Sequence, residues 1–370
     1  MSNTKKVRMA NVELLRIIAM LNVIVLHFLG VGGVLTGSTG PYFYIASAIY
    51  SFAIVSTNVY VLISGYFTVT STFRTSRIFK ILLEFVTYAL GIYLVYCLVM
   101  HFALDIDTFS VRDLTRTYLF PVINEENWFV TSFVLIMLLS PFYNILIRAL
   151  SRKQFSVLII GITVLFSFVP TVVPFASWQL GQGNGYTFVW FTVLYFIAAY
   201  LRLYGLPKAW TKPKLIAGYL VTSLITLVAV ILEHDHPGVL TEERNSYYFF
   251  FNYNSILVLI ASLCIFALFL KFDINNEKLV KVINRIASYS FAVFLIHTHP
   301  AIADILWFQG VKTSLVVDTL RFIPVMIVSA IVIYALCSII EQFRLIIFSP
   351  VLKSQKLQDF FNELDKKLGL

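Results

Sequence analysis

Three ionisable side chains, Glu13, Arg16 and His27, lie in the mostly apolar stretch ELLRIIAMLNVIVLHFLG of residues 13–30. A charge in the middle of a bilayer costs at least about 2.5 to 3.5 kcal/mol, so such residues commonly have a function. Arg16 and His27 are eleven residues apart, which on a helix is about three turns and about 16 Å along one face. Glu13 lies one turn before Arg16 and can pair with its guanidinium, which lowers the cost of burial.

The chemistry available to this group is general base catalysis beside a fixed positive charge. A neutral imidazole in a weakly polar cavity can take a proton from a hydroxyl. Arg16 stays protonated and cannot act as a base, but it can hold the surroundings of the base or bind a phosphate. Two structural interpretations compete: Arg16 can extend to the lipid headgroups, and His27 can be a core histidine bonded to a backbone carbonyl or to another helix. Their common helix face favours function.

The composition indicates which elements must position these residues. Of the 370 residues, 59% are hydrophobic and only 13% are charged, and the mean hydropathy is +0.84. These values exclude a soluble domain of this size and indicate a polytopic membrane protein. We expect an all-α protein of about ten transmembrane helices, because helices satisfy their backbone polar groups without water. Apolar runs near the roughly 20 residues that cross a bilayer occur at residues 11–31, 43–68, 78–102, 127–147, 155–174, 186–204, 214–232, 248–270, 286–308 and 319–343.

The distribution of charge predicts the orientation of these helices. With the N-terminus inside, most of the 28 lysines and arginines lie in cytoplasmic segments, while the long outer loops 103–126 and 233–247 are acidic. This pattern places both termini in the cytoplasm. The net charge of +9 therefore reflects orientation in the membrane, and no nucleic-acid partner is expected. We expect residues 1–350 to form one membrane domain and residues 351–370 to form a cytoplasmic amphipathic tail on the inner membrane face.

Five segments together resemble the acyltransferase-3 family of integral membrane O-acyltransferases, of the type that acetylates bacterial cell-surface polysaccharides. The first segment carries an acidic residue, then Arg, ten residues and His. The others are VYVLISGYF (59–67), FRTSRIFK (73–80), ENWFVTSFVLIMLLSPFYN (126–144) and SYSFAVFLIHTHP (288–300), and they occur in the order typical of the family. The resemblance implies a multi-pass protein of the bacterial plasma membrane.

The resemblance also implies a reaction. An acyl group, most simply acetyl, would pass from cytoplasmic acyl-CoA to a hydroxyl of a cell-surface or lipid-linked glycan. His27 would be the general base, and Arg16 would steady the site or bind the donor. No activated cysteine or serine is evident in the sequence, which favours direct attack by the hydroxyl over an acyl-enzyme. We expect no metal, and the histidines of LEHDHPG are interpreted as part of a solvated loop. Membrane lipids are the other expected partners, and a homo-oligomer is left open.

Four residues near the cytoplasmic side are candidates for binding acyl-CoA. Arg74 and Arg77 are three residues apart, and guanidinium groups suit the phosphates of CoA. Arginines in an inner loop also satisfy the positive-inside bias alone. Ser64 and Gly65 would let the pantetheine arm approach the backbone closely, although small residues equally serve helix packing.

Two further residues are candidates for the acceptor side. Trp128 opens the fourth apolar run, where it would stack on a sugar ring or anchor the helix at the membrane interface. His297 should lie near mid-membrane and form a second polar wall of the cavity. Asp304 follows it by seven residues and would orient its imidazole only if the helix bends or another side chain bridges the gap. We expect His299 to face elsewhere and to approach the outer surface.

Two other functions stay open at this point. A polysaccharide exporter or flippase would also need a polar cavity, and a sensing membrane domain could keep the fold without the chemistry. An exporter has no reason to place a base and phosphate-binding arginines in line. The leading hypothesis is therefore the O-acyltransferase.

Overall fold

All regular structure in the described part of the chain is helical. A computed structural model describes residues 9–115, 127–173, 183–241 and 246–369. Nine helical segments within these residues are long and apolar enough to cross a membrane. The one predicted segment that is not among these nine, residues 186–204, forms α10 (Phe188–Tyr204), an apolar helix of 17 residues. The prediction of an all-α, multi-pass membrane protein is therefore confirmed.

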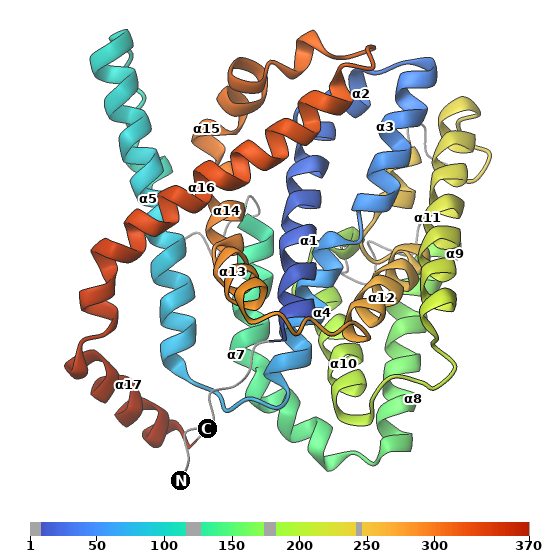
Figure 1. Cartoon of the computed structure of the whole chain (residues 1–370), viewed down its shortest axis with the longest axis vertical. Coiled ribbons are helices and arrows are strands. Elements are labelled where there is room, and N and C mark those ends of the chain that lie inside the picture. Colours follow the sequence, from blue (N-terminus) through green and yellow to red (C-terminus); the bar gives the residue numbers. More distant parts are fainter. Residues whose placement is uncertain (1–8, 116–126, 174–182, 242–245, 370) are drawn as a thin grey trace.

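The spans lie side by side in one bundle (Figure 1). We call the end at which α17 (Gln355–Leu368) and the start of α5 lie the tail end, and the opposite one the α2 end, after the short helix α2 (Val34–Gly37). The spans other than α10 are α1 (Ala10–Leu29), α3 (Gly40–Ala53) with α4 (Ser56–Thr68), α5 (Thr75–Leu104), α7 (Trp128–Ala149), α8 (Arg152–Thr163) with α9 (Val169–Val172), α11 (Lys212–Asp235), α12 (Ile256–Leu270) with the turn before it, α13 (Glu277–Ala287) with α14 (Ser290–His297), and α16 (Phe322–Leu352).

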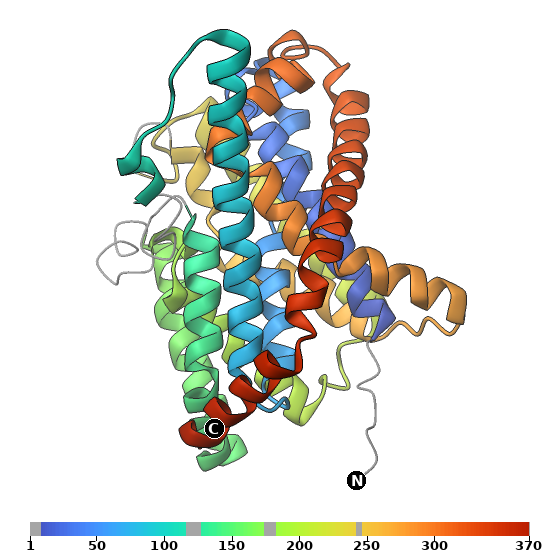
Figure 2. The same ribbon diagram turned by 90° about the vertical axis from the view of Figure 1, so that its left-hand side faces the viewer.

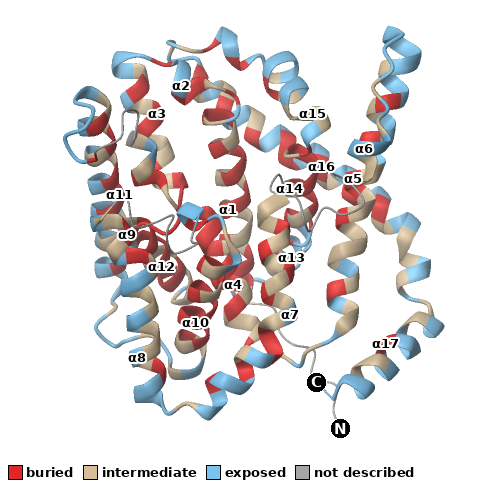
Figure 3. Cartoon of the chain, turned by 180° about the vertical axis from the view of Figure 1, so that it is seen from behind, coloured by how far each residue is buried: buried red, intermediate tan, exposed pale blue. Residues whose placement is uncertain are grey.

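The core of the bundle is formed by α1, α4 and α10, where the buried residues are concentrated (Figure 3). Trp190 and Tyr195 of α10 are among the largest fully buried side chains. The outer helices carry many exposed apolar side chains, such as Val95 of α5 and Ile331 of α16. Exposed apolar surface on this scale is expected where lipid, and not water, surrounds a helix. The short length of α10 is therefore consistent with its central position, away from lipid.

The predicted span of residues 286–308 is broken into pieces. α14 has only eight residues and ends at His297, after which α15 (Pro300–Asp304) begins with a proline. Proline disfavours the helical conformation in the residue before it, and His299 is extended with ψ of 126°. The preceding helix, α13, projects from the side of the bundle (Figure 2). The break places the imidazole of His297 at the end of a helix.

The predicted tail forms the amphipathic helix α17, which packs against the start of α5. The carboxylate of Asp365 accepts hydrogen bonds from the backbone N–H of Thr75 at 2.9 Å and from its hydroxyl at 2.7 Å. Phe361 is buried, and its ring lies 5.0 Å from that of Phe79. Asp365 therefore caps the N-terminus of α5, where backbone N–H groups lack helical partners.

Candidate active site

A cavity of about 560 Å³ lies inside the bundle, between α1, α4, α7 and α14. It extends along α1 from Met20 to His27, about 10 Å of helix, and on to Val31 in the turn after α1. Most of its wall is aromatic. Ionisable nitrogen enters it at two positions only among its lining residues, His27 and His297. The predicted face of α1 therefore carries its imidazole to a cavity within the bundle.

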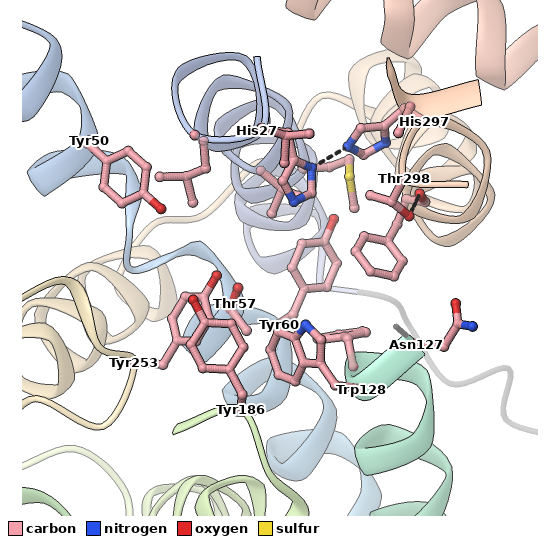
Figure 4. A pocket seen from close by; sticks show the side chains of 18 of the residues that line it. His27, Tyr50, Thr57, Tyr60, Asn127, Trp128, Tyr186, Tyr253, His297 and Thr298 are labelled. Atoms are coloured by element: carbon pink, nitrogen blue, oxygen red, sulfur yellow. Dashed lines mark hydrogen bonds between the residues drawn. The ribbon is translucent and has the colours of Figure 1, made fainter. Parts of the chain in front are cut away.

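The imidazoles of His27 and His297 are hydrogen-bonded to each other (Figure 4). His27 Nδ1 lies 2.9 Å from His297 Nε2, and the ring centroids are 5.1 Å apart. His297 is almost fully buried, with 1% of its surface exposed. Its other nitrogen, Nδ1, lies 2.5 Å from the carbonyl oxygen of Val293, one turn earlier in α14.

These contacts determine which nitrogen carries each proton. A carbonyl oxygen only accepts hydrogen bonds, so His297 Nδ1 carries a hydrogen and donates it to Val293. In the neutral ring His297 Nε2 is then an acceptor, and His27 Nδ1 must be the donor. His27 Nε2 is left with its lone pair, and in Figure 4 this nitrogen points into the cavity. The arrangement presents a base of defined tautomer to whatever occupies the cavity.

The two histidines meet because of how their helices end. His27 lies in the last turn of α1, and the break after α14 leaves His297 beside it. The sequence predicts His297 as a second polar wall of the cavity. In the structure it also bonds directly to the predicted base. The bonds of its imidazole are to His27 and Val293, so these two residues, and not Asp304, orient the ring. His299 faces away from the cavity, as expected, but the expectation that it approaches the outer surface is wrong, because the side chain is buried, with its Nε2 3.0 Å from the carbonyl oxygen of Ala89.

Trp128 lies on the cavity wall, within a cluster of aromatic rings. Its ring centroid is 4.6 Å from that of Tyr186 and 5.8 Å from that of Tyr253, to which it is nearly parallel at 27°. Both tyrosines also line the cavity. Trp128 therefore faces a polar aromatic wall and not the lipid, an arrangement in which flat apolar faces and hydroxyl groups occur together.

The sequence reasoning missed Tyr186 and Tyr253, although a signal for them existed. Tyr186 follows the glycine-rich segment GQGNG, and Gly185 has a φ of +88°. A Cβ at Gly185 would lie 2.7 Å from the backbone N of Asn254 and 2.8 Å from Cβ of Tyr253. Glycine is therefore needed for two aromatic loops, far apart in sequence, to touch here.

The chain is similar to a known family over most of its length. The family model of an acyltransferase domain, acyltransferase-3, matches residues 9–341. The chain belongs to the acyltransferase-3 family. It matches no curated protein and no solved structure. The match begins before α1 and ends within α16, so it includes every residue that lines the cavity. The cavity is thus part of the acyltransferase domain.

In this membrane acyltransferase, Arg16 lies just below the cavity. Its Nη1 is 2.9 Å from Oε2 of Glu13, which is the pairing that the spacing predicts. The hydroxyl of Tyr60 donates to the carbonyl oxygen of Arg16 at 2.8 Å, and the side chain of Tyr60 lines the cavity. Tyr60 therefore connects the backbone of Arg16 to the wall of the cavity. The guanidinium of Arg16 itself does not line the cavity.

The other predicted donor-binding residues of the acyltransferase lie outside the cavity. Arg74 and Arg77 are exposed at the start of α5, where Arg77 Nη1 donates to Ser71 Oγ at 3.0 Å. Ser64 Oγ donates to the carbonyl oxygen of Tyr60 in its own helix. Gly65 lies against α10, where a Cβ would be 3.0 Å from Cα of Tyr195. The contacts of Ser64 and Gly65 are those of helix packing.

Metal-binding clusters and cysteines are two further kinds of group that bear on the chemistry of the site. Among them no group of three or more His, Cys, Asp or Glu side chains is arranged to hold a metal ion. The three cysteines are Cys97, Cys264 and Cys337, and none of them lines the cavity. The chemistry of the site therefore centres on the two imidazoles and the polar groups around them.

Proposed function

We propose that this acyltransferase moves an acyl group, most simply acetyl, from cytoplasmic acyl-CoA to a hydroxyl of a cell-surface or lipid-linked glycan, with His27 as general base. The observation that carries the proposal is the lone pair of His27 Nε2, which faces the cavity while Nδ1 is held by His297. A base in a defined tautomer and an acceptor-sized cavity are what acyl transfer to a hydroxyl needs.

The reaction follows from this geometry. The acceptor oxygen attacks the thioester carbonyl carbon while its proton passes to His27 Nε2. The tetrahedral intermediate then expels the thiolate, the carbon–sulfur bond breaks, and the thiolate sulfur takes the proton from His27. The hydrogen bond from His27 Nδ1 to His297 Nε2 persists throughout and stabilises the positive ring that forms in the middle of the reaction, since His297 offers it a lone pair.

The wall of the cavity supports a sugar as the acceptor. Trp128 and the neighbouring tyrosines combine aromatic faces, which pack on the apolar face of a sugar ring, with hydroxyls that bond its polar edge. These residues line the same cavity as His27 Nε2. A sugar against this wall would therefore present a hydroxyl to the base.

Three basic residues support an acyl-CoA donor at the tail end. Arg16 lies beneath the cavity floor, and Arg74 and Arg77 are exposed at the start of α5. Phosphates of CoA would stay at this end, while the thiol arm reaches past Tyr60 along α1 to His27. Ser64 and Gly65 are not assigned to the donor site, because their contacts serve helix packing.

Acyl transfer in sealed vesicles tests the proposal. Purified protein is reconstituted with the de-acylated surface glycan of the producing cells on one side, and radiolabelled acetyl-CoA is supplied to the other. We expect label in the glycan and a mass increase of one acetyl group per modified site, both lost in His27→Ala. Unchanged acylation by a correctly folded His27→Ala protein would exclude the mechanism. Glycan that crosses the membrane without label would instead indicate transport.

A further inference from the structure

Helix α13 differs from the spans in its direction. Although α13 and α14 together are long enough to cross a membrane, α13 projects from the side of the bundle at the level of the start of α1 (Figure 2). It packs against α1, and the chain reaches it from the end of α12 through residues 271–276. The side-chain amide of Asn11, at the start of α1, donates to the carbonyl oxygen of Phe269, near the end of α12, at 2.8 Å. Because one span begins and another ends here, α13 lies at one face of the membrane.

The side chains of α13 fall on three faces of the helix, since residues three or four positions apart are neighbours on its surface. The first face is buried, the second is apolar but exposed, and the third is basic and exposed. These faces consist, in this order, of Ile283 and Ala287, of Leu279, Val282 and Ile286, and of Lys278, Lys281 and Arg285. A helix that turns an apolar and a basic face away from the protein is typical of helices that lie in the headgroup layer of a membrane.

The basic face of α13 is available to an anion outside the protein. Residues 271–287 hold four basic and two acidic side chains. One of the acids, Glu277, lies in the first turn of α13, where a negative charge stabilises the helix dipole. Lys278 and Lys281 are exposed and form no ion pair within the described part of the chain.

The apolar face indicates what kind of anion this is. Leu279 and Val282 have 48% and 52% of their surface exposed, and they lie beside Lys278 on the helix. A soluble phosphate bound to the lysines would leave this apolar surface in water. The headgroup of an anionic phospholipid would meet the lysines while its acyl chains cover the apolar side chains, so a lipid fits both faces.

The junction between α13 and α14 is bonded to α16. The hydroxyl of Tyr334 donates to the carbonyl oxygen of Ile286 at 3.1 Å and lies 2.9 Å from the hydroxyl of Ser290, the first residue of α14. Nη2 of Arg285 donates to Oε1 of Gln342 at 3.1 Å. The end of α13 and the start of α14 therefore form one bonded unit with α16, so whatever holds α13 also supports α14.

We propose that α13 binds anionic phospholipid headgroups through Lys278 and Lys281, and that this binding holds His297 in place beside His27. The helix α14 has only eight residues, so His297 lies about 10 Å from the junction with α13. The contact with lipid stands without the acyl transfer proposed above, whereas its effect on His297 rests on that function.

Hydrogen–deuterium exchange tests the lipid contact without reference to activity. The full chain is placed in nanodiscs of phosphatidylcholine, with or without phosphatidylglycerol. Each lysine near an anionic surface strengthens binding about fivefold, so we expect the amides of residues 277–287 to exchange about fivefold or more slowly with phosphatidylglycerol. The difference should shrink at high salt, which screens exposed charges. Equal exchange in both kinds of nanodisc would overturn the proposal.

Two double variants and a control assign the contact to the lysines. Lys278→Gln with Lys281→Gln keeps the helix propensity and should remove the difference between the lipids, whereas Lys278→Arg with Lys281→Arg should keep it. The control, Arg112→Gln with Lys312→Gln, removes the same charge from exposed positions outside α13 and should change nothing in residues 277–287. A lipid effect that persists in the double glutamine variant would overturn the assignment.

Acetyl transfer in the same nanodiscs tests the effect on His297. With acetyl-CoA and the de-acylated surface glycan of the producing cells, we expect phosphatidylglycerol to raise kcat several-fold for the native protein and not for the double glutamine variant. If exchange in α13 responds to the lipid but kcat does not, the link to His297 is wrong. Absence of transfer under every condition, with the exchange result unchanged, would instead count against the proposed function.

Discussion

Two groups of polar side chains are buried between the membrane-spanning helices, and they differ in what they leave unbonded. At His27 and His297 one ring nitrogen faces a cavity. Between α5 and α16, Glu341 accepts from Nε and Nη2 of Arg344 at 2.6 and 2.7 Å and from Tyr88 at 2.6 Å. Glu84 lies 3.3 Å from the same guanidinium. We call Tyr88, Glu84, Glu341 and Arg344 the α5–α16 cluster.

Burial and charge alone do not distinguish a structural group from a reactive one here. The α5–α16 cluster carries more formal charge than the histidine pair, yet none of its residues lines the cavity that contains His27. Its carboxylates and guanidinium bind each other and connect two long helices. The histidine pair is less charged but presents a free acceptor to a cavity. Spare hydrogen-bonding capacity at a cavity is therefore the better mark of a site in this protein.

The largest expected effect is on catalysis. His27→Gln removes the base, and general base catalysis contributes roughly 10²- to 10⁴-fold, so we expect kcat to fall at least about 100-fold with little change in melting temperature. Single-turnover acetyl transfer and thermal unfolding measure the two quantities. His101→Gln, at an exposed histidine near the end of α5, is the control. A kcat within a few-fold of native for His27→Gln would show that the histidine pair is not a reactive group.

Breaking the α5–α16 cluster should lower the stability of the protein and leave its catalytic rate nearly unchanged. Arg344→Met leaves Glu341 and Glu84 without their counter-charge, and removing one partner of a buried ion pair typically costs about 3 to 5 kcal/mol of unfolding free energy. The folded fraction should still transfer acetyl groups at close to the native rate. Replacing both partners, in Glu341→Leu combined with Arg344→Met, should recover part of the loss. A native melting temperature for Arg344→Met would contradict a structural role.

His297 is expected to act through His27 as a positioning residue. His297→Leu removes the acceptor for His27 Nδ1, so the tautomer and the ring plane are no longer held, and we expect kcat to fall on the order of 10- to 100-fold, as for other groups that orient a functional imidazole. KM should change little. His297→Gln, whose side-chain oxygen can accept the same hydrogen, should restore part of kcat. Equal losses in both variants would argue that His297 serves packing alone.

Removing single hydroxyl groups should have the smallest expected effects on stability. Tyr88→Phe removes the bond to the Glu341 carboxylate, and a hydrogen bond to a charged group contributes roughly 1.5 to 3 kcal/mol. Tyr219→Phe is a matched comparison, because its hydroxyl donates to the neutral carbonyl oxygen of Phe52 at 2.8 Å and should cost only about 1 kcal/mol. Thermal unfolding of both variants measures the difference, and a larger loss for Tyr219→Phe would show that the charge of Glu341 adds nothing.

Much of the fold could be predicted from the sequence, because the membrane imposes a length and an apolar composition on each span. The pairing of Glu13 with Arg16 also follows from spacing, since residues one turn apart are neighbours on any helix. The break after α14 was harder to place. Pro300 signalled it, but a proline inside a long apolar run can also be accommodated in a kinked membrane helix.

The sequence by itself determined which side chains are available to the site. They include an imidazole on the face of α1 that also carries Arg16, within a chain of membrane-spanning helices. Only the tertiary structure decided that His297 bonds to His27, that Trp128 turns to a cavity and not to lipid, and that Gly65 serves packing. It also gathered Tyr186 and Tyr253 from segments far apart in the chain. The reason is physical: local spacing sets neighbours along one helix, whereas contacts between helices depend on how all the apolar faces pack together.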